Sequence, residues 1–578
     1  MNALKTVILF TALLQSLIEA VIVYNGSSTA KDDWWKYATF YQVYPRSFKD
    51  SDGDGLGDIK GITSQLQYLV DAGVNAAWFS PIFISPGIDA GYDISDFRDI
   101  DPNFGTMSDF DELLDQAHQL GLKIILDFVP NHTSDQHAWF QLSKNRTAGY
   151  EDYYVWMDGA NSTTPPNNWR GMFGSSAWTF VPERGQYYYH LFTAQQPELN
   201  FRNPRVVQEM KDILTFWLDK GIDGFRADAV PYIFETFPTD PGTPETYNPN
   251  AQRSAIQDQP ESLDMVYQWR AVLDDYNRRN GGNTRVFITE GYTNITATMP
   301  YYGNDTVDGA HFTFNFFLIT NTTSNSTASE VVRVITAWFQ NMPSRYVANW
   351  VLGNHDRPRV ATRLGVENVD GYNMLISLLP GVVNSYYGEE IGMENGVVTW
   401  EQGQDPRACG GPRENFLTEG RDFERTPFHW NSSVNAGFST ANSTWLPVSA
   451  KYITNNLELQ SRDGVKSHFH VYQGLMKLRQ EDTIIFGNLN IEALDTYVFA
   501  FTRELAGNDT YVFLFNKGNY SSTVSLSSFT SLSNDIRVVL SSTDSFRNEG
   551  DFLPKSRIYL DAHEAIVAKS RPNNLIHC

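Results

Sequence analysis

Four short strand-like runs, spread over the middle of the chain, each end on an acidic residue. They cover 122–127, 222–228, 285–290 and 350–356, and they end on Asp127, Asp228, Glu290 and Asp356. In a barrel of alternating parallel strands and helices, catalytic groups come from the carboxyl ends of several different strands, so these carboxylates can converge on one pocket. The pattern predicts an enzyme built around clustered carboxylates.

Strands and helices alternate along most of the remaining chain. Apolar residues recur at helical spacing between short apolar runs, which is typical of parallel strands joined by helices. Ser108 is predicted to cap one of these helices and Gly121 to close it. Predicted strands cover 38–44, 76–79 and 124–129, and predicted helices cover 206–217, 264–279 and 331–338. The predicted fold class is therefore α/β, a (β/α)8 TIM barrel.

Two segments break this rhythm. Residues 133–204 are rich in aromatic residues, Asn, Gly and Pro without a helical period, and from about residue 488 the sequence alternates as antiparallel strands do. A chain of 578 residues also exceeds what one core usually supports. The expected order is a signal peptide (1–20), the first part of a catalytic barrel (21–132), an irregular inserted domain after the third strand (133–204), the second part of the barrel (205–487) and a C-terminal antiparallel β domain (488–578).

The N-terminus has the form of a secretory leader. Lys5 precedes an apolar run of about a dozen residues, which is shorter than the roughly 20 needed to span a membrane, and the small residue Ala20 ends it. Many Asn-x-Ser/Thr sites fit passage through a secretory compartment. They include Asn25, Asn145, Asn161, Asn294, Asn304, Asn321, Asn325, Asn442 and Asn508. We expect a secreted (extracellular), N-glycosylated protein with no membrane span.

The net charge of −23 disfavours partners that are themselves negatively charged, namely nucleic acid and anionic membrane surfaces. Aromatic residues make up 14% of the chain, which suits stacking on sugar rings as well as core packing. The composition thus argues against a nucleic-acid-binding function.

Only two cysteines occur, Cys409 and Cys578. They either pair with each other or remain a free thiol and a free terminal residue, and the sequence leaves both alternatives open. Because residues 575–578 carry no apolar tail, the sequence as given predicts no lipid anchor and a released chain.

An acidic, glycine-rich loop follows the first predicted strand. Acidic oxygens at alternate positions of such a loop can surround a hard cation, as in the first half of an EF-hand, although the Glu that would end that motif is missing. A solvated acidic turn is the alternative. We expect a structural Ca²⁺ here, since no nucleophile is present, at Asp50, Asp52, Asp54, Leu56 and Asp58.

Asp228 and Glu290 are suited to different chemical roles. Arg226 lies two residues before Asp228, so on a strand both side chains point to the same face, where the guanidinium keeps the carboxylate ionised. Such a carboxylate is a credible nucleophile, although a buried ion pair would have the same pattern. Glu290 ends an apolar strand, which suits a carboxylic acid whose pKa must be raised to donate a proton. His355 places a hydrogen-bond donor beside the third carboxylate, Asp356.

These motifs together resemble glycoside hydrolase family 13, the α-amylase superfamily, and within it the insect maltases. The resemblance covers essentially the whole chain after the leader. It rests on Phe-Tyr-Gln-Val-Tyr-Pro-Arg-Ser-Phe at 40–48, Asp-Phe-Val-Pro-Asn-His at 127–132, Gly-Phe-Arg-Ala-Asp at 224–228, Glu290, and Asn-His-Asp at 354–356, in the order of the family's conserved regions.

The resemblance implies a retaining α-glucosidase of the maltase and sucrase type, which takes small oligosaccharide substrates. Such an enzyme releases glucose from the nonreducing end of short α-1,4-linked oligosaccharides and from sucrose. It implies that Asp228 is the nucleophile, Glu290 the acid/base and Asp356 the stabiliser of the transition state. It also implies that the glucosyl unit is bound by Asp89, Tyr92, His132, Arg226, His355 and Arg425, and that Phe192 and Gln196 face the neighbouring aglycone.

Two positions depart from the family's pattern. Glu198 stands where Asp is usual in Gln-Pro-Asp-Leu-Asn, and Gly291 follows the acid where Ala is common. Ala229 follows the nucleophile, and small residues other than valine there resemble enzymes that prefer α-1,4 links or sucrose over α-1,6 links. Isomaltose is therefore expected to be a poor substrate.

Two other functions fit the same fold. The site could transfer glucose mainly to another sugar instead of water, and the superfamily also includes catalytically silent transporter subunits and surface receptors. The silent chains typically lack parts of the carboxylate set. Because all three carboxylates are present here, an enzyme is the favoured reading.

Overall fold

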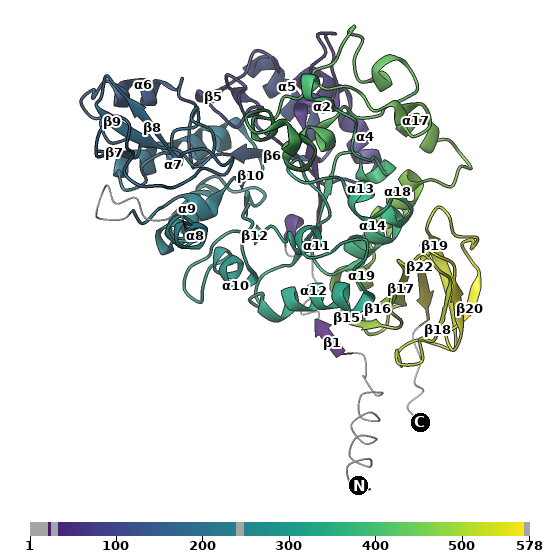
Figure 1. Ribbon diagram of the computed structural model, residues 1–578. Helices are drawn as coiled ribbons and strands as arrows, with labels where there is room; N and C mark the ends of the chain where they lie inside the picture. Colours follow the sequence, from purple (N-terminus) through teal and green to yellow (C-terminus); the bar gives the residue numbers. More distant parts are fainter. Residues whose placement is uncertain (1–20, 25–32, 238–247, 572–578) are drawn as a thin grey trace, which may run out of the picture.

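The computed structural model describes residues 21–24, 33–237 and 248–571 of the chain (Figure 1). The predicted signal peptide (1–20), the glycosylation site at Asn25 and one of the two cysteines, Cys578, lie outside the described residues. Among the residues that the structure describes, no helix is long and apolar enough to cross a membrane.

Eight parallel strands form the central sheet, in the order β12-β11-β10-β6-β3-β2-β14-β13. The sheet is closed by side chains, since Asn349 at the start of β13 donates from Nδ2 to the Thr313 carbonyl (2.6 Å) and accepts from the Asn315 amide (2.9 Å). The strands are β2 (Thr39–Val43), β3 (Ala76–Phe79), β6 (Lys123–Phe128), β10 (Gly224–Ala227), β11 (Val286–Thr289), β12 (Phe312–Thr313), β13 (Asn349–Val351) and β14 (Val382–Tyr386). The predicted (β/α)8 barrel is confirmed.

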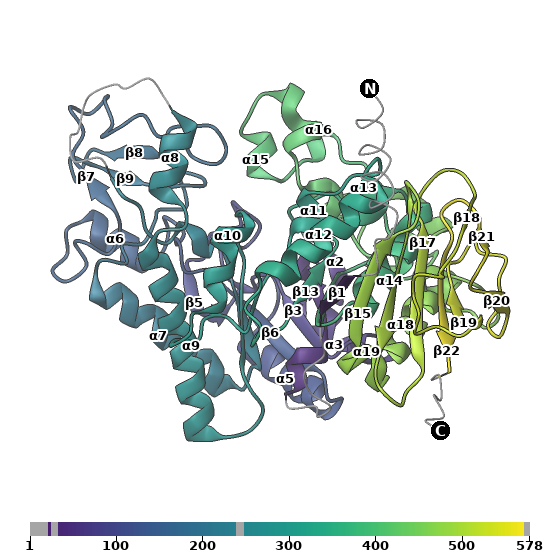
Figure 2. The ribbon, with the colours of Figure 1, turned by 90° about the horizontal axis from the view of Figure 1, so that it is seen from below.

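Helices surround the strands (Figures 1 and 2) and bury their apolar faces against them. Trp217, Trp269 and Trp338, one on each of three helices, are completely buried. The main helices are α3 (Ile59–Ser64), α4 (Leu66–Asp71), α5 (Met107–Gln119), α7 (Pro204–Lys220), α9 (Pro260–Asn280), α12 (Ala328–Asn341), α14 (Val369–Leu378) and α18 (His468–Leu478). Shorter helices are α2 (Pro45–Phe48), α10 (Ile295–Thr298), α11 (Phe317–Thr320), α13 (Val360–Leu364), α17 (Leu457–Gln460) and α19 (Asp482–Phe486).

Helix α5 (Met107–Gln119) begins two residues earlier than predicted. Its N-cap is Thr106, whose hydroxyl accepts from the Asp109 amide while the Asp109 carboxylate accepts from the Thr106 amide. This reciprocal capping box satisfies two backbone donors at once, which a cap at Ser108 would not do. The prediction of Ser108 as the cap was therefore wrong.

The irregular segment after β6 forms a small domain of its own. It contains α6 (Ala138–Lys144) and a three-stranded antiparallel sheet, β7-β9-β8 (Trp156–Met157, Gln186–Tyr189 and Trp178–Val181). Its core includes the buried rings of Trp169, Trp178 and Tyr189. Ile256 of α8 (Pro249–Ile256) completes this core, so a later part of the chain also contributes to it. A two-stranded ribbon, β4 (Phe83–Ile84) and β5 (Asp96–Ile100), follows β3.

The C-terminal strands form a seven-stranded sheet in the order β1-β15-β16-β17-β22-β19-β20, on the side of the barrel opposite the inserted domain (Figure 2). Its edge strand β1 (Val21–Tyr24) comes from the start of the described chain and pairs with β15. The expected barrel range of 21–132 therefore begins with a strand of the other domain. The other strands of this sheet are β15 (Asn488–Ala493), β16 (Val498–Glu504), β17 (Thr510–Asn516), β19 (Asp535–Ser541), β20 (Phe552–Pro554) and β22 (Ala565–Ser570). Two further strands, β18 (Ser522–Val524) and β21 (Ile558–Leu560), pair with each other in a separate two-stranded sheet.

Candidate active site

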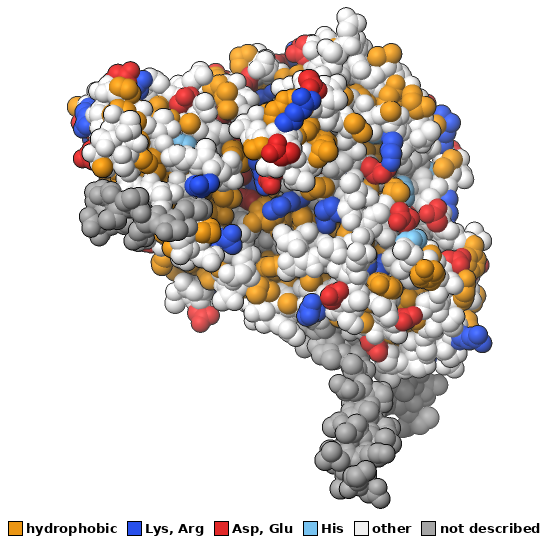
Figure 3. Space-filling model, viewed as in Figure 1, with side chains coloured by type: hydrophobic (Ala, Val, Ile, Leu, Met, Phe, Trp, Pro, Cys, Tyr) orange, Lys and Arg blue, Asp and Glu red, His pale blue; other side chains and the backbone are white. Residues whose placement is uncertain are grey.

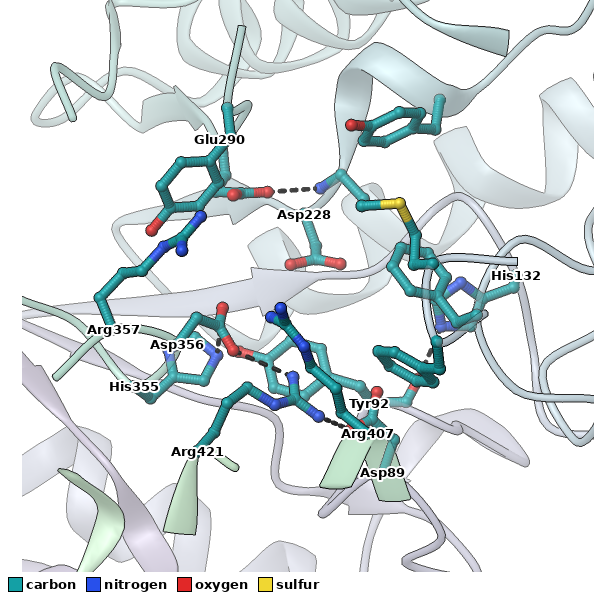
Figure 4. Close-up of a pocket in the computed structure, with 16 residues that line it drawn as sticks. Asp89, Tyr92, His132, Asp228, Glu290, His355, Asp356, Arg357, Arg407 and Arg421 are labelled. Atoms are coloured by element: carbon teal, nitrogen blue, oxygen red, sulfur yellow. Dashed lines mark hydrogen bonds and ion pairs between the residues drawn. The ribbon is translucent and has the colours of Figure 1, made fainter. Parts of the chain in front are cut away.

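A pocket lies at the carboxyl ends of the barrel strands, and the inserted domain forms one side of its mouth. In the space-filling view, charged side chains gather around a hollow near the middle of the face (Figure 3). The pocket is lined by Asp89, Tyr92, His132, Met172, Phe173, Phe192, Asp228, Ala229, Tyr232, Glu290, Tyr292, His355, Asp356, Arg357, Arg407 and Arg421 (Figure 4).

Three carboxylates in this pocket follow three barrel strands. Asp228 follows β10, Glu290 follows β11 and Asp356 lies beyond β13. Arg226, buried within β10, connects the first two: its guanidinium is 2.5 Å from Asp228 Oδ1 and 3.8 Å from Glu290 Oε2. Parallel strands bring their carboxyl ends to one rim, which is why residues far apart in sequence meet here.

Ala229 has an unusual backbone conformation, with φ at 49°. This left-handed region is costly for a residue with a side chain. It orients the Ala229 amide so that it donates to Glu290 Oε2 at 2.9 Å. Ala229, which directly follows Asp228, thus holds the Glu290 carboxyl in position.

The three carboxyl groups differ in acidity because their surroundings differ. Burial raises the pKa of Glu290 to about 7, against the opposing charge of Arg226. Burial also raises the pKa of Asp228, and Arg226 again opposes it. At Asp356 burial acts in the same direction, but His355 and three arginines outweigh it and lower the pKa well below its ordinary value. Near neutral pH the site can therefore hold a protonated Glu290 beside an ionised Asp356.

Arg421 connects three carboxylates at the inner end of the pocket. It donates to Asp89 Oδ1 (2.7 Å), to Asp356 Oδ1 (3.0 Å) and to the buried carboxylate of Asp405 (2.6 Å). Arg421 lies four residues before the predicted Arg425, and no local sequence pattern distinguishes it as a site residue. Its role is visible only once Asp89 and Asp356 are brought together.

A second buried group supports Arg226 from behind. The Asp127 carboxylate, whose pKa burial raises to about 7, accepts from Trp78 Nε1 (2.6 Å) and Tyr92 Oη (2.8 Å), and lies 3.3 Å from the Arg226 guanidinium. Tyr92 is thereby held against the floor of the pocket, with its ring stacked on that of His355 at 5.3 Å.

His132 is held as a neutral ring. Burial lowers its pKa to about 4. Its Nδ1 pairs with Asn131 Oδ1 (2.9 Å) and its Nε2 with the Gln196 amide (3.0 Å), which also donates to Asp89 Oδ2 (3.2 Å). Gln196 therefore connects the returning end of the inserted domain to two predicted sugar-binding residues.

His355 and Arg425 form the other wall. Gln42, on β2, lies 2.8 Å from His355 Nδ1, and burial lowers the pKa of this histidine to about 3. Arg425 donates from Nε to the His355 carbonyl (2.7 Å) and lies 3.0 Å from Asp356 Oδ1. The second imidazole nitrogen of His355 is 3.4 Å from Asp356 Oδ2.

The structure brings most of the predicted site residues to the pocket surface. Asp89, Tyr92, His132, Phe192, Asp228, Glu290, His355 and Asp356 line it. Three others, Gln196, Arg226 and Arg425, lie directly behind these residues and contact them. Beyond Arg421, the sequence analysis did not identify Tyr292, Phe173, Arg357 or Arg407, because side chains in loops carry no periodic signal.

The acidic loop lies apart from this pocket. Asp50, Asp52 and Asp58 each offer an oxygen, and these oxygens lie within 4.8 Å of one another. Asp54 is outside this group, and its carboxylate instead accepts from the Leu56 amide at 2.7 Å. Asp50 and Asp58 already accept backbone amides, from Gly53 (2.7 Å) and Gly61 (2.7 Å) respectively. Carboxylate oxygens arranged in this way suit a hard cation such as Ca²⁺.

The chain is similar to known proteins over most of its length. Maltase 1 of Drosophila virilis is 47% identical over 547 residues, covering 93% of this chain and 86% of that protein. A salivary alpha-glucosidase of Aedes aegypti is 44% identical over 82% of this chain and 84% of that enzyme. The solved structure of the alpha-glucosyl transfer enzyme XgtA superposes with a TM-score of 0.81 at 33% identity, covering 94% of this chain and all of that one.

The barrel also matches a known protein family. The catalytic domain of alpha amylase matches residues 42–487, which span the barrel and the inserted domain. The pocket with its three carboxylates lies within this match. The chain therefore belongs to the α-amylase family of glycoside hydrolases.

Proposed function

We propose that this protein is a retaining α-glucosidase of the maltase type, which releases glucose from the nonreducing end of short α-1,4-linked oligosaccharides and from sucrose. One observation carries the proposal: Asp228, Glu290 and Asp356 line a single pocket, and Arg226 contacts both Asp228 and Glu290. The similarity to a maltase and to a salivary alpha-glucosidase supports it.

The reaction follows from the protonation states. Asp228 attacks the anomeric carbon as the bond from that carbon to the leaving oxygen breaks, and Glu290 gives its proton to that oxygen. Glu290, now ionised, takes a proton from water as the water attacks the anomeric carbon, which frees glucose and restores Asp228. Asp356, kept ionised by its histidine and arginine neighbours, stabilises the positive charge that develops on the ring.

Release from the chain end is supported by the inner wall of the pocket. Arg421 and Asp89 form an ion pair at 2.7 Å, and both side chains are almost completely buried. Groups placed there can bind the hydroxyls of one glucosyl unit, which favours entry of the sugar by its end.

Glucose release from maltose and sucrose by the purified protein tests the proposal. The Asp228→Asn variant keeps the size of the side chain but lacks the nucleophile, so turnover should fall by several orders of magnitude while thermal unfolding stays unchanged. Activity that survives in this variant would refute the assignment of the nucleophile. Analysis of the products for new oligosaccharides separates hydrolysis from the glucosyl transfer that the name of XgtA describes.

Isomaltose tests the linkage preference. The small side chain of Ala229 lines the pocket beside the nucleophile, and we propose that α-1,4 links are preferred over α-1,6 links. Hydrolysis of isomaltose at a rate comparable with that of maltose would overturn this preference.

We further propose that the acidic loop binds a structural Ca²⁺ through Asp50, Asp52 and Asp58, with Asp54 and Leu56 next to them in the same loop. The cluster of carboxylate oxygens supports this proposal. Extensive chelation should lower the thermal unfolding temperature and release about one Ca²⁺ per chain. Unchanged unfolding together with no detectable calcium would disprove it.

We also propose that the protein is secreted and N-glycosylated. The eight asparagines named above that the structure describes are all exposed, as an accepting side chain must be: Asn145, Asn161, Asn294, Asn304, Asn321, Asn325, Asn442 and Asn508. The printed name of the Aedes aegypti relative, a salivary enzyme, supports secretion. Enzymatic deglycosylation of the protein from insect-cell medium should reduce its apparent mass.

A further inference from the structure

We propose that the mouth of the pocket is an anion-binding aglycone site, centred on Arg357, which favours α-glucosides whose leaving group carries a carboxylate or phosphate. The proposal rests on the α-glucosidase function stated above and names a substrate class for the same site. It follows from the position of Arg357, from its lack of a counterion and from the side chains around it.

Arg357 is fixed at the pocket by a stack of aromatic rings. It follows Asp356 directly, and its guanidinium carbon lies 4.7 Å from the ring centre of Tyr292. Tyr292 in turn stacks on Phe316, with ring centres 4.3 Å apart and planes 17° from parallel. Asn354 Nδ2 donates to the Tyr292 hydroxyl at 2.7 Å. Figure 4 shows the Arg357 side chain pointing into the space that Glu290 and Asp356 also face.

No neighbour within 33–237 or 248–571 balances the charge of Arg357 with an ion pair. Among the described residues no carboxylate forms an ion pair with it, and its Nε atom is buried without a hydrogen-bond partner. The deeper arginines differ, since Arg226, Arg421 and Arg425 each contact a carboxylate of the site. The Arg357 side chain is partly exposed at the mouth, so its guanidinium can form a charge-assisted hydrogen bond with an incoming anion.

The rest of the mouth contributes one more cation and several apolar groups. Arg407, on α15 (Pro406–Cys409), lines the pocket and is paired at 2.7 Å with Glu419 of α16 (Phe416–Glu419), which does not line it. Met172, Phe173 and Phe192 of the inserted domain provide an apolar surface. Lys and Arg side chains border the hollow in Figure 3.

The carboxylates of the pocket do not oppose an anion at the mouth. Asp89 and Asp356 are ion-paired with Arg421, and Asp228 with Arg226. Glu290 accepts from the Ala229 amide, and its pKa of about 7 leaves it largely protonated in weakly acidic solution. The uncompensated charge near the leaving group is therefore positive.

A matched pair of substrates tests the proposal. Maltobionate and maltitol contain the same α-1,4-glucosyl bond to an open-chain aglycone, and they differ at one carbon, which is a carboxylate in the first and an alcohol in the second. We expect kcat/KM to be higher for maltobionate than for maltitol, and the advantage to shrink at high salt, where a partly exposed ion pair is screened. A ratio at or below one in the wild-type protein would overturn the proposal.

Variants at Arg357 separate charge from positioning. Arg357→Gln should lower the maltobionate-to-maltitol ratio about fivefold, the effect of one partly exposed ion pair, whereas Arg357→Lys should keep most of it. If Arg357 served only to hold the Tyr292 ring, Arg357→Gln would slow both substrates equally and leave the ratio unchanged. Arg413→Gln is the matched control, since Arg413 is 68% exposed, pairs with Glu401 and does not line the pocket.

Binding of the isolated leaving groups distinguishes this site from the hydrolytic function. Titration calorimetry should detect gluconate binding that exceeds sorbitol binding and that Arg357→Gln weakens by a similar factor. If maltose were not hydrolysed but this binding were observed, the proposed α-glucosidase function would fail and the anion site would stand. Rapid maltose hydrolysis with equal binding of gluconate and sorbitol would overturn the anion site alone.

Discussion

Single residues set the chemistry of this pocket through burial and charge. Glu290 and Asp228 both lie at the end of apolar strands, yet Arg226 approaches Asp228 at 2.5 Å and Glu290 only at 3.8 Å. The nearer guanidinium favours ionised Asp228, while burial leaves Glu290 with a pKa of about 7. The unequal distances from Arg226 thus favour an ionised nucleophile at Asp228 and a protonated acid at Glu290.

This difference predicts the alkaline limb of the pH profile. Glu290 must carry a proton in order to protonate the leaving oxygen. The value of kcat/KM for maltose should therefore fall as the pH rises through about 7. Substrates with a nitrophenol leaving group need less protonation and should lose less activity in Glu290→Gln than maltose does. A profile that stays flat well above pH 7, or equal losses for both substrates, would contradict the assignment of the acid.

Arg421 is the residue that we expect to be least replaceable among those the sequence did not reveal. Arg421→Lys keeps the charge but cannot contact Asp89, Asp356 and Asp405 together. Loss of such buried contacts costs about 2–3 kcal/mol, so kcat/KM for maltose should fall roughly 100-fold. Arg413→Lys on the exposed surface should change it less than twofold, and equal effects of the two variants would contradict this role.

At the scale of elements, local sequence decides where helices begin. Thr106 and Asp109 form the capping box of α5, and Thr327 and Glu330 form the same motif on α12. Both pairs follow the spacing that lets each side chain accept the other residue's amide. The motif is therefore a sequence signal, and Ser108 was the wrong choice because its partner three residues later is not placed to reciprocate.

The cap of α5 gives a direct test. Thr106→Ala should destabilise the protein by about 1 kcal/mol, since the Asp109 amide loses the hydroxyl that accepts from it. Ser108→Ala, in the same helix and exposed, should change stability by less than about 0.5 kcal/mol. Urea unfolding followed by the far-ultraviolet signal measures both. Equal shifts would contradict the assignment of the cap.

The returning end of the inserted domain carries an unusual pair of acids. Glu198, which replaces the family's usual Asp, accepts from Asn131 Nδ2 at 3.1 Å, and the buried carboxyl of Glu235 lies close enough to raise its pKa. Burial and each other's presence raise the pKa of Glu198 well above its ordinary value, and burial raises that of Glu235, while Arg202 and Tyr189 are the charged and titratable groups nearby. Two carboxyls so close must share a proton.

Because the pKa values of both acids are raised in the folded state, the protein loses stability as the pH rises above the unfolded pKa of about 4.3. Glu198→Gln needs no shared proton, so the variant should gain thermal stability over the wild-type protein progressively toward alkaline pH and differ least near about pH 5. Glu209→Gln, which breaks a partly exposed pair with Arg98, should show no such trend. A parallel trend in both variants would contradict the shared proton.

At the scale of the whole molecule, buried polar contacts join the barrel to the C-terminal domain. Asp370 of α14 pairs with His468 of α18 at 2.7 Å and accepts the amide and hydroxyl of Thr543, just beyond β19. Arg503 of β16 donates from Nη1 to the Leu378 carbonyl at the end of α14. The two domains therefore share hydrogen bonds that neither could satisfy alone.

This junction predicts a pH-dependent stability. Burial alone would lower the pKa of His468, but Asp370 outweighs it and raises the pKa above its ordinary value. The stabilisation is therefore fully present below about pH 6.5 and is lost as the pH rises through the folded pKa. His468→Gln should cost most at about pH 6 and least at about pH 9, as measured by thermal unfolding. A cost that does not depend on pH would contradict the ion pair.

The sequence by itself determined the alternation of strands and helices, the inserted segment and the acidic residues at strand ends. These features are local, because strand and helix periods and capping motifs depend on residues a few positions apart. Parallel strands then bring Asp228, Glu290 and Asp356 to one rim, whatever the details of packing.

Only the tertiary structure decided which other side chains reach that rim. Arg421 meets Asp89 across 332 residues, and β1 pairs with β15 of a distant domain. Tyr292 and Phe316 fix Arg357 where, in the part of the chain that the structure describes, no carboxylate pairs with it. Such contacts depend on how loops cross in space, and loop side chains leave no period in the sequence from which to predict them.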